Sequence, residues 1–264
     1  MSRDNALVRK ARAVRDGKQR ELIFVEGVRL CEEALHARLF IEDALCTERV
    51  AQDEGCAPLL QALRDAGVFV RLASERVMDF ICDTKTPQGI ALLAHRPAAR
   101  AAAFEKALHN SLFVILHRLN NPANAGSILR TAEAAGANGV IATAGSTDMF
   151  SPKALRGAMG SSFRLPLWTG AGFSEAIEWC RARDIKTVAT DARATRLYSD
   201  IDWTKPKALL VGAEAGGLTE DETAACDEVI HIPMRAPVES LNVGVAAAIV
   251  LYEAARQRSN FPSS

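Results

Sequence analysis

Residues 232–243 are the most informative stretch of this chain, and they read Ile232-Pro233-Met234-Arg235-Ala236-Pro237-Val238-Glu239-Ser240-Leu241-Asn242-Val243. It joins the end of a predicted strand to a loop that two prolines stiffen, and then to an Ala-rich helix predicted over 242–256. Loops that carry polar groups beside a rigid scaffold are where binding and chemistry concentrate. Ser240 and Asn242 can each cap the helix, but one cap is sufficient, so the pair also indicates a binding site.

A second polar loop leads into a helix predicted over 126–135 and reads Asn120-Asn121-Pro122-Ala123-Asn124-Ala125-Gly126-Ser127-Ile128-Leu129-Arg130. Asn124 is a good cap residue for this helix. Arg130 follows six residues later in an apolar pattern, and a buried Arg must be paired or face a cleft. Either it bonds a neighbouring carboxylate such as Glu133, or it faces a site at the carboxyl ends of parallel strands, where open α/β sheets bind ligands.

A third loop, Val211-Gly212-Ala213-Glu214-Ala215-Gly216-Gly217-Leu218, follows another predicted strand. Its glycines allow a sharp turn and a close approach to a ligand. Glu214 either pairs with Arg130, accepts a hydrogen bond from a ligand, or is simply solvated. The glycine spacing is not that of a dinucleotide fingerprint, and no Gly-Lys-Ser/Thr occurs, which excludes a P-loop and argues against a nucleotide-dependent oxidoreductase.

The second half of the chain predicts a parallel sheet covered by helices on both faces, because its strands are short continuous apolar runs. Strands are predicted over 112–116, 139–142, 163–167, 187–190, 208–211 and 229–232. Helices are predicted between or after them over 126–135, 153–159, 173–183, 219–225 and 242–256. We therefore expect an α/β domain over 109–264.

The first half predicts a small α/β sandwich over 1–96, again from alternating strands and helices. Strands are expected over 22–27, 41–46, 68–70 and 89–94, and helices over 6–19, 28–37, 58–66 and 74–80. The Ala-rich stretch that begins Arg96-Pro97-Ala98-Ala99-Arg100 interrupts the apolar pattern, and we assign 97–108 as a linker.

The composition is that of a soluble globular protein without a general polyanion-binding surface. Hydrophobic residues make up 48% of the 264 residues and charged residues 24%, and the formal net charge is zero. Residues 1–20 are locally basic, which predicts either a solvated helix face or a phosphate-contacting face. Six scattered cysteines and five dispersed histidines form no metal-binding pattern, so we expect no metal and a cytoplasmic protein with reduced thiols. His231, on an apolar strand, is predicted to be a core histidine.

In this order, the three loops resemble the motifs of the SpoU (TrmH-like) branch of the SPOUT RNA methyltransferases. The shared pattern comprises Asn124, Gly126, Arg130, Gly212, Glu214, Gly217, Leu218, Ile232, Pro233, Met234, Ser240, Leu241, Asn242, Val243, Tyr252 and Glu253. The resemblance covers about residues 109–258. Phe24-Val25-Glu26-Gly27 and Pro87-Gln88-Gly89-Ile90 are similar to the L30e-like substrate-binding domain that often precedes the catalytic one. The chain departs from the pattern at Ala236, where Gly is common, and at Gly244, where Ser is frequent.

This resemblance implies a trefoil-knotted α/β catalytic domain, which dimerises with its last helix against the partner. It implies methyl transfer from S-adenosyl-L-methionine to a ribose 2′-hydroxyl of RNA. We favour ribosomal RNA as the substrate. A transfer RNA substrate, or a non-catalytic dimeric RNA-binding protein, are the alternatives.

By the same resemblance, the loops that carry Gly212, Ile232, Met234 and Leu241 hold the cofactor, mostly through backbone groups. A ribose hydroxyl must lose its proton as the methyl group transfers, so a nearby cation that favours the alkoxide lowers the barrier. Arg130 is our candidate, acting by phosphate positioning and alkoxide stabilisation because guanidinium stays charged.

The remaining catalytic candidates are the polar side chains that orient Arg130 and the ribose, namely Asn124, Glu214, Ser240 and Asn242. RNA contacts are expected on the basic amino-terminal helix and on the helix after Ser151, at Arg9, Lys10, Arg12, Lys153 and Arg156.

Overall fold

The computed structural model describes residues 5–104, 110–214 and 216–258. The chain divides into two compact units. The first consists of the described part of Met1–Pro97 together with Phe150–Arg164, and the second of Ala98–Met149 and the described residues from Leu165 onward. The sequence had placed Phe150–Arg164 in the second domain. The predicted boundaries 1–96, 97–108 and 109–264 remain predictions, and linker residues 105–108 lie outside the described residues.

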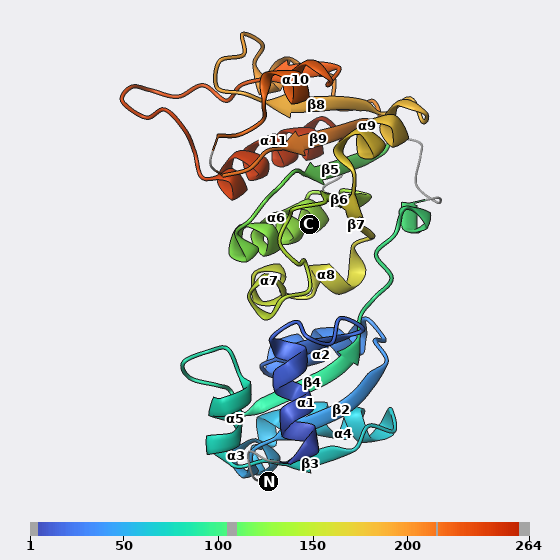
Figure 1. Ribbon diagram of the computed structural model, residues 1–264, viewed down its shortest axis with the longest axis vertical. Helices are drawn as coiled ribbons and strands as arrows, with labels where there is room; N and C mark the ends of the chain where they lie inside the picture. The colour runs from blue at the N-terminus through green and yellow to red at the C-terminus, as the bar shows by residue number, and fades with distance from the viewer. Residues whose placement is uncertain (1–4, 105–109, 215, 259–264) are drawn as a thin grey trace. The chain divides into compact units, whose positions relative to one another are not determined.

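The first unit contains a mixed sheet of four strands in the order β1-β4-β2-β3 (Figure 1). Strand β4 (Ile90–His95) runs antiparallel to β1 (Leu22–Glu26) and to β2 (Ile41–Cys46), and β3 (Val70–Leu72) runs parallel to β2. The helices are α1 (Ala6–Arg15), α2 (Val28–His36), α3 (Glu48–Gln52), α4 (Ala57–Asp65) and α5 (Glu75–Ile81), with a short 3-10 turn at Glu54–Cys56. The predicted elements are present, but β3 covers 70–72 and not the predicted 68–70, and α1 ends at Arg15 and not at residue 19; α3 is additional.

Two further helices belong to this unit, α7 (Pro152–Ala158) and α8 (Ser161–Arg164). Helix α7 packs against β1. The predicted strand over 163–167 is wrong, because α8 continues to Arg164 and β7 (Leu167–Ala171) begins only after Pro166. Proline disfavours the helical conformation in the residue before it and has no backbone N–H for a sheet ladder, so the strand starts after it.

The second unit contains a sheet of six parallel strands in the order β10-β8-β9-β5-β6-β7 (Figure 1). Besides β7, the strands are β5 (Leu112–Leu116), β6 (Gly139–Thr143), β8 (Lys186–Thr190), β9 (Lys207–Val211) and β10 (Glu228–Ile230). The helices are α6 (Pro122–Ala134), α9 (Phe173–Arg181), α10 (Glu220–Ala224) and α11 (Val243–Arg258), with 3-10 turns at Ala101–Phe104 and Tyr198–Asp200. The predicted parallel sheet is therefore confirmed.

Helix α6 starts earlier than predicted because Asn121, and not Asn124, caps it. The Asn121 side chain accepts a hydrogen bond from the backbone N–H of Ala123 (2.9 Å). Pro122 then occupies the first helical position, where its missing N–H costs nothing. As a consequence, the side chain of Asn124 is free for other contacts.

The core of the second unit is built on β5, all of whose residues are buried. Successive side chains of a strand point to opposite faces, so complete burial requires cover on both. On one face, Phe113 and Ile115 pack in a cluster with residues of α9. The rings of Phe113 and Trp179 meet edge to face at 5.3 Å, and those of Phe113 and Phe104 at 5.2 Å. Helices α6 and α11 pack side by side, and α6 also contacts β6.

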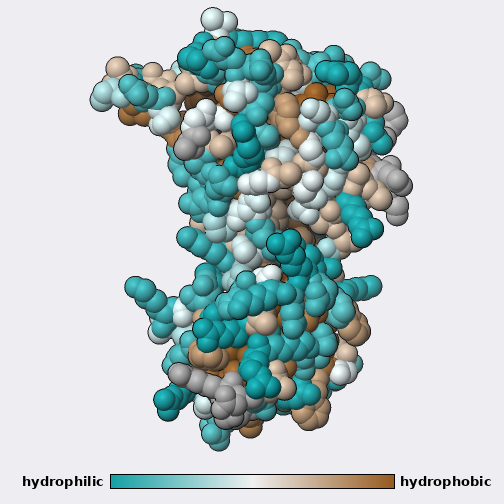
Figure 2. Space-filling view, in the orientation of Figure 1, coloured by the Kyte–Doolittle hydropathy of each residue, from teal (hydrophilic) through white to brown (hydrophobic). Residues whose placement is uncertain are grey.

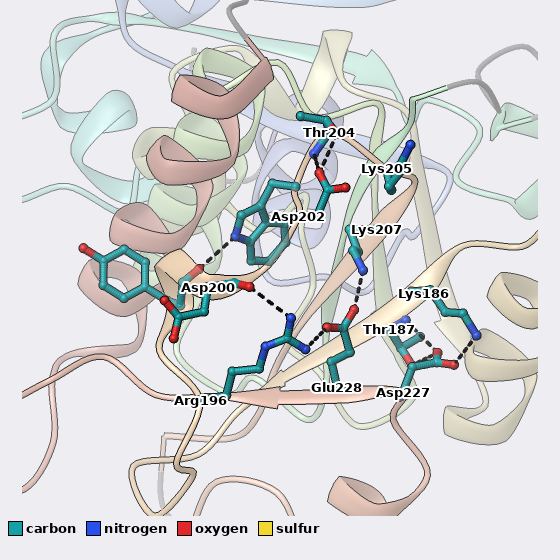
Figure 3. Close-up of polar contacts among 12 residues, drawn as sticks. Lys186, Thr187, Arg196, Asp200, Asp202, Thr204, Lys205, Lys207, Asp227 and Glu228 are labelled. Atoms are coloured by element: carbon teal, nitrogen blue, oxygen red, sulfur yellow. Dashed lines mark hydrogen bonds and ion pairs between the residues drawn. The ribbon is translucent and has the colours of Figure 1, made fainter.

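Charged side chains begin the three strands β8, β9 and β10 (Figure 3). The buried ammonium of Lys207 forms an ion pair with Glu228, and Arg196 binds the other carboxylate oxygen at 2.5 Å. Lys186 pairs with Asp227 at 2.9 Å. Because a buried charge is costly unless it is paired, these contacts fix β10 and the segment around Arg196 to the rest of the sheet.

Hydrophilic residues cover most of the face drawn in Figure 2, and hydrophobic residues show there in small patches. None of the helices in the described ranges is both long enough and apolar enough to cross a membrane.

Replacing Phe113 by Ala is expected to lower the free energy of unfolding of the second unit by about 3–5 kcal/mol, through lost apolar contacts and a cavity. Urea unfolding followed by tryptophan fluorescence tests this, because the chain's three tryptophans, Trp168, Trp179 and Trp203, all belong to that unit. Phe69→Ala is the control, since Phe69 is 70% exposed and belongs to the first unit. If both variants unfolded at the same urea concentration, the packing role of Phe113 would be contradicted.

Candidate functional site

A cavity of about 460 Å³ lies at the carboxyl ends of β8, β9 and β10. The loops after these strands and the start of α11 line it. The lining residues are Thr190, Asp191, Ala192, Val211, Gly212, Ala213, Glu214, Gly216, Gly217, Ile230, His231, Ile232, Met234, Ser240, Leu241, Asn242, Val243, Ala246 and Ala247. Its volume is in the usual range for small-molecule sites, roughly 300–1,000 Å³. The three loops that the sequence singled out do meet here, since Asn242 also contacts Asn124 (3.3 Å).

Gly212 is required by the close approach of two backbone segments in the turn after β9. A Cβ atom at this position would lie 2.8 Å from the backbone carbonyl carbon of Gly217. The turn is closed by a hydrogen bond from the Gly217 N–H to the Ala213 carbonyl (3.2 Å). Gly216 and Gly217 both have positive φ, 86° and 62°, which glycine adopts without strain. The glycines of this turn therefore place backbone atoms in the wall of the cavity.

The carboxylate of Glu214 joins this turn to the loop before α6. One oxygen accepts from the backbone N–H of Asn120 (3.1 Å), and the other from the N–H of Asn121 (3.0 Å) and the Asn124 amide (3.2 Å). Partial burial raises the pKa of Glu214, but these donors and its own backbone N–H outweigh it and hold the pKa below the usual value. The carboxylate is thus ionised at neutral pH. Its stabilising effect is complete above the unfolded-state pKa and is lost as the pH falls through the lowered one.

Asn242 extends this set of polar contacts into the cavity. Its side-chain N–H donates to the Asn124 oxygen at 3.3 Å. Its own oxygen caps α11 by accepting from the backbone N–H groups of Gly244 (2.9 Å) and Val245 (3.4 Å). Asn242 therefore caps the helix and lines the cavity at once, and its role in binding stays a prediction. Ser240 also lines the cavity and is exposed.

Arg130 differs from its sequence-based prediction. Its side chain is exposed and not buried, and it forms no hydrogen bond or ion pair with the described residues. Glu214 binds asparagine donors and not this guanidinium. Arg130 is not among the residues that line the cavity of its own chain. The helical pattern of α6 places its apolar neighbours Ile128 and Leu129 in the core, which turns Arg130 outward.

The positions predicted to hold the cofactor, Gly212, Ile232, Met234 and Leu241, all line the cavity. The lining combines apolar side chains with backbone groups at the glycine turn. Backbone N–H and C=O groups supply the few placed polar contacts that ligand cavities need, and the apolar side chains supply contact area for a heteroaromatic ring. These residues thus fit a nucleoside-containing cofactor such as S-adenosylmethionine.

Two cavity residues had no functional signal in the sequence. Asp191 follows β8, and hydrogen bonds from the Arg193 side chain and backbone hold the pKa of its carboxyl below the usual value. His231 was predicted to be a core histidine; it is instead partly exposed and lines the cavity just after β10. Strand β10 ends at Ile230, one residue before His231, so the imidazole ring of His231 lies beyond the strand and lines the cavity.

The buried side chain of His117 connects the loop before α6 to β6 and α10. The ring of His117 lies 3.0 Å from the Thr143 hydroxyl and 3.0 Å from the Glu222 carboxylate. Arg118 donates to both oxygens of Glu222 at 2.8 Å. Glu222, on α10, thereby ties the loop that carries Asn120 to the segment after the glycine turn. The sequence does not reveal this contact, because the residues lie more than 100 positions apart.

The basic residues predicted on α1 have different surroundings. Arg9 is exposed and has no ion pair with a described residue. Lys10 forms an ion pair with Asp43 (3.0 Å), and the Arg12 guanidinium lies over the ring of Phe80, 4.2 Å from its centre. Residues 1–4 of the basic run lie outside the described residues. Arg9 is therefore the most available of the three for a phosphate.

On α7, Lys153 is exposed, whereas Arg156 is partly buried. Arg156 donates to Asp83 at 2.6 Å and lies 3.8 Å from Glu26. Part of its charge is thus already balanced within the first unit. Within the described ranges, no group of three His, Cys, Asp or Glu side chains is placed to hold a metal ion.

Comparison with known proteins matches both parts of the chain to family models. Residues 111–252 match the SpoU rRNA Methylase family, and residues 24–99 match the model described as RNA 2'-O ribose methyltransferase substrate binding. The chain is 31% identical over 228 residues to the 23S rRNA (guanosine(2553)-2'-O)-methyltransferase RlmP of Bacillus subtilis. The aligned region covers 86% of each of the two chains.

Two solved structures extend the likeness to the cofactor complex. The SpoU methyltransferase AviRb of Streptomyces viridochromogenes in complex with the cofactor AdoMet superposes with a TM-score of 0.85 at 28% identity, covering 97% of this chain and 99% of that one. The AdoMet-bound rRNA methyltransferase of Sinorhizobium meliloti also gives 0.85 at 28%, covering 97% and 96%. The predicted fold and cofactor are confirmed; the knot stays an expectation from resemblance.

Substituting Gly212 by Ala is expected to weaken S-adenosylmethionine binding about tenfold, because the added methyl group displaces the glycine turn. Isothermal titration calorimetry measures the Kd. Gly172→Ala is the matched control in the same unit, since a Cβ there meets Glu175 at an ordinary 3.6 Å. An unchanged Kd for Gly212→Ala would show that the turn does not shape the cofactor site.

Proposed function

Because this chain belongs to the SpoU rRNA methylase family, we propose that it transfers the methyl group of S-adenosylmethionine to a ribose 2′-hydroxyl of ribosomal RNA. The observation that carries the proposal is the cavity at the carboxyl ends of β8, β9 and β10, beside which Glu214, Asn124 and Asn242 form one set of hydrogen bonds. Similar proteins of Bacillus subtilis and Streptomyces viridochromogenes are named 23S rRNA 2'-O-methyltransferases, which supports the choice of substrate class.

The polar residues of the site act mainly by positioning. When bound, S-adenosylmethionine supplies an electrophilic methyl group on a sulfonium centre. Glu214 is held by three donors and keeps the glycine turn and the Asn120 loop in register. Asn124 and Asn242 present amide groups that bind and orient the ribose. Fixed hydrogen-bonding groups of this kind lower the barrier because they need no reorganisation during the reaction.

Arg130 is the proposed catalytic residue. Its exposed guanidinium has no partner among the described residues and is available to an RNA phosphate or to the hydroxyl that reacts. Guanidinium keeps its charge, so Arg130 positions the phosphate and stabilises the developing alkoxide but does not remove a proton as a base.

RNA contacts are proposed on exposed basic residues of both helices singled out by the sequence, with Arg9 on α1 and Lys153 on α7 as the most accessible. Lys10, Arg12 and Arg156 contribute from positions that are partly engaged within the protein. All six cysteines are free thiols, which suits a reducing compartment such as the cytoplasm.

A homodimer through α11 is part of the proposal. Residues 243–252 of this helix are all apolar, glycine or tyrosine, and helices that are apolar on all sides are normally buried. Yet Val245 is 49% and Tyr252 is 47% exposed, and Ile249 lies between them along the same stripe. A second copy that packs on this stripe would cover it.

The direct test is transfer of labelled methyl from S-adenosylmethionine to RNA from cells that lack the protein. Ribosomal and transfer RNA are separated and digested to nucleosides. A labelled 2′-O-methylnucleoside in ribosomal RNA is expected. Label found only in transfer RNA would show that the substrate is transfer RNA and not ribosomal RNA. Neither label nor cofactor binding would favour a non-catalytic RNA-binding protein.

Arg130→Ala is expected to lower kcat for methyl transfer about 100- to 1,000-fold, in line with the loss of one charge-stabilising group. S-adenosylmethionine binding should stay unchanged, because Arg130 does not line the cavity. Arg181→Ala, which removes another exposed helical arginine of the second unit, is the control and should keep full activity. Wild-type turnover in Arg130→Ala would remove Arg130 from the mechanism.

Val245→Asp combined with Tyr252→Asp is expected to convert the dimer to a monomer, since charges on the stripe would have to be desolvated at the interface. Light scattering coupled to size-exclusion chromatography measures the mass. Phe69→Asp, at an apolar and exposed site in the first unit, should leave the dimer intact. A dimer that survives the double substitution would place the interface elsewhere.

A further inference from the structure

A second cavity, of about 270 Å³, lies within the first unit and has no part in the reaction described above. It is formed by the end of β1, the first turn of α2, the loop after α5, and α7. Its polar lining consists of Glu26, Arg29, Thr84, Thr86, Gln88 and Arg156. The volume lies just below the usual range of drug-sized sites, about 300–1,000 Å³, and suits a single ring system.

Glu26 is the buried acidic group of this cavity, with only 6% of the residue exposed. One of its oxygens accepts the backbone N–H of Asp83 (3.0 Å), and the other accepts the Thr84 hydroxyl. An ionised carboxylate has about four acceptor positions. Each oxygen of Glu26 therefore retains capacity for one more donor, and a buried carboxylate gains from having it filled.

Arg156 offers the complementary group beside it. One terminal nitrogen, Nη2, donates to Asp83 at 2.6 Å. The other, Nη1, is buried and has no hydrogen-bond partner among the described residues. It lies 3.8 Å from the Glu26 oxygen, too far for a hydrogen bond between them. The cavity thus presents an unused donor next to an acceptor that has free capacity.

The charges around the cavity favour a neutral ligand. Arg29 and Arg156 oppose Glu26 and the neighbouring Asp83, so the site is balanced without an added ion. A phosphate would bring further negative charge beside the buried carboxylate. A nucleobase is neutral, and among the four RNA bases only guanine has two adjacent donors, N1–H and N2–H₂, next to an acceptor, O6.

We propose that this cavity binds one unpaired guanine base, with N1–H and N2–H₂ donating to Glu26 and O6 accepting from Arg156 Nη1. Leu30 and Met159 supply apolar contacts for the ring. Proteins read unpaired RNA bases on these edges. That the base belongs to substrate RNA rests on the proposed function, and it agrees with the match of residues 24–99 to a substrate-binding model.

The test uses the full-length protein with saturating S-adenosylmethionine and four probes, namely GMP, IMP, AMP and inorganic phosphate. Ligand-observed NMR titration gives each Kd. GMP is expected to bind, and IMP, which lacks the N2 amino group, to bind about tenfold more weakly, as for other lost base contacts. Glu26→Gln should abolish the preference for GMP over IMP. Glu32→Gln, a carboxylate change on α2 outside the cavity, should retain it.

Arg156→Lys provides a second variant if Glu26→Gln does not fold, and it should weaken GMP binding while keeping the charge beside Asp83. Equal binding of GMP and IMP or AMP, full competition by phosphate, or no GMP binding at all would overturn the guanine site. Methyl transfer measured on the same protein separates the two proposals. Activity without GMP binding removes only the guanine site, whereas GMP binding without methyl transfer to any RNA removes the proposed activity and leaves a base-binding cavity.

Discussion

The site depends on one carboxylate that holds two backbone segments together. Glu214 stands in the turn after β9 and accepts hydrogen bonds from Asn120, Asn121 and Asn124, more than 85 residues earlier in the chain. Glu214 itself is exposed, so these three donors, and not burial, hold its carboxylate in place. The turn and the loop therefore form as a pair, and Asn124 is left in place to meet Asn242 at the start of the last helix.

The parallel sheet explains why these groups converge. Its central strands β5 and β9 are buried along their whole length, and β8, β9 and β10 begin with charged residues, at Lys186, Lys207 and Glu228. The ion pairs at that end keep the strands aligned (Figure 3). The opposite ends are then free to carry irregular loops, and the cavity lies among them. The rigid strands thus fix the positions of the glycine turn after β9 and of Asn124 and Asn242 beside the cavity.

Sequence reasoning was least successful where burial or helix phase decided the outcome. The pattern around Arg130 indicated burial, but Ile128 and Leu129 take the core positions of α6 and turn the guanidinium outward. His231 lies one residue beyond the end of β10 and so reaches the cavity. The contacts of His117 with Glu222, and of Glu26 with Arg156, join residues far apart in the chain, which periodicity does not detect.

Most strands and helices, the parallel sheet, and the three loops that line or border the cavity could be predicted from the sequence alone, whereas the strand predicted over 163–167 was wrong. It could do so because apolar periodicity, glycine turns and helix caps are local properties of the chain. The family and its cofactor also followed from the ordered motifs. The folded chain was needed to show which polar groups pair, that Arg130 has no partner among the described residues, and that Phe150–Arg164 packs with the first unit. These outcomes depend on burial and on distances between remote segments, and no local pattern encodes them.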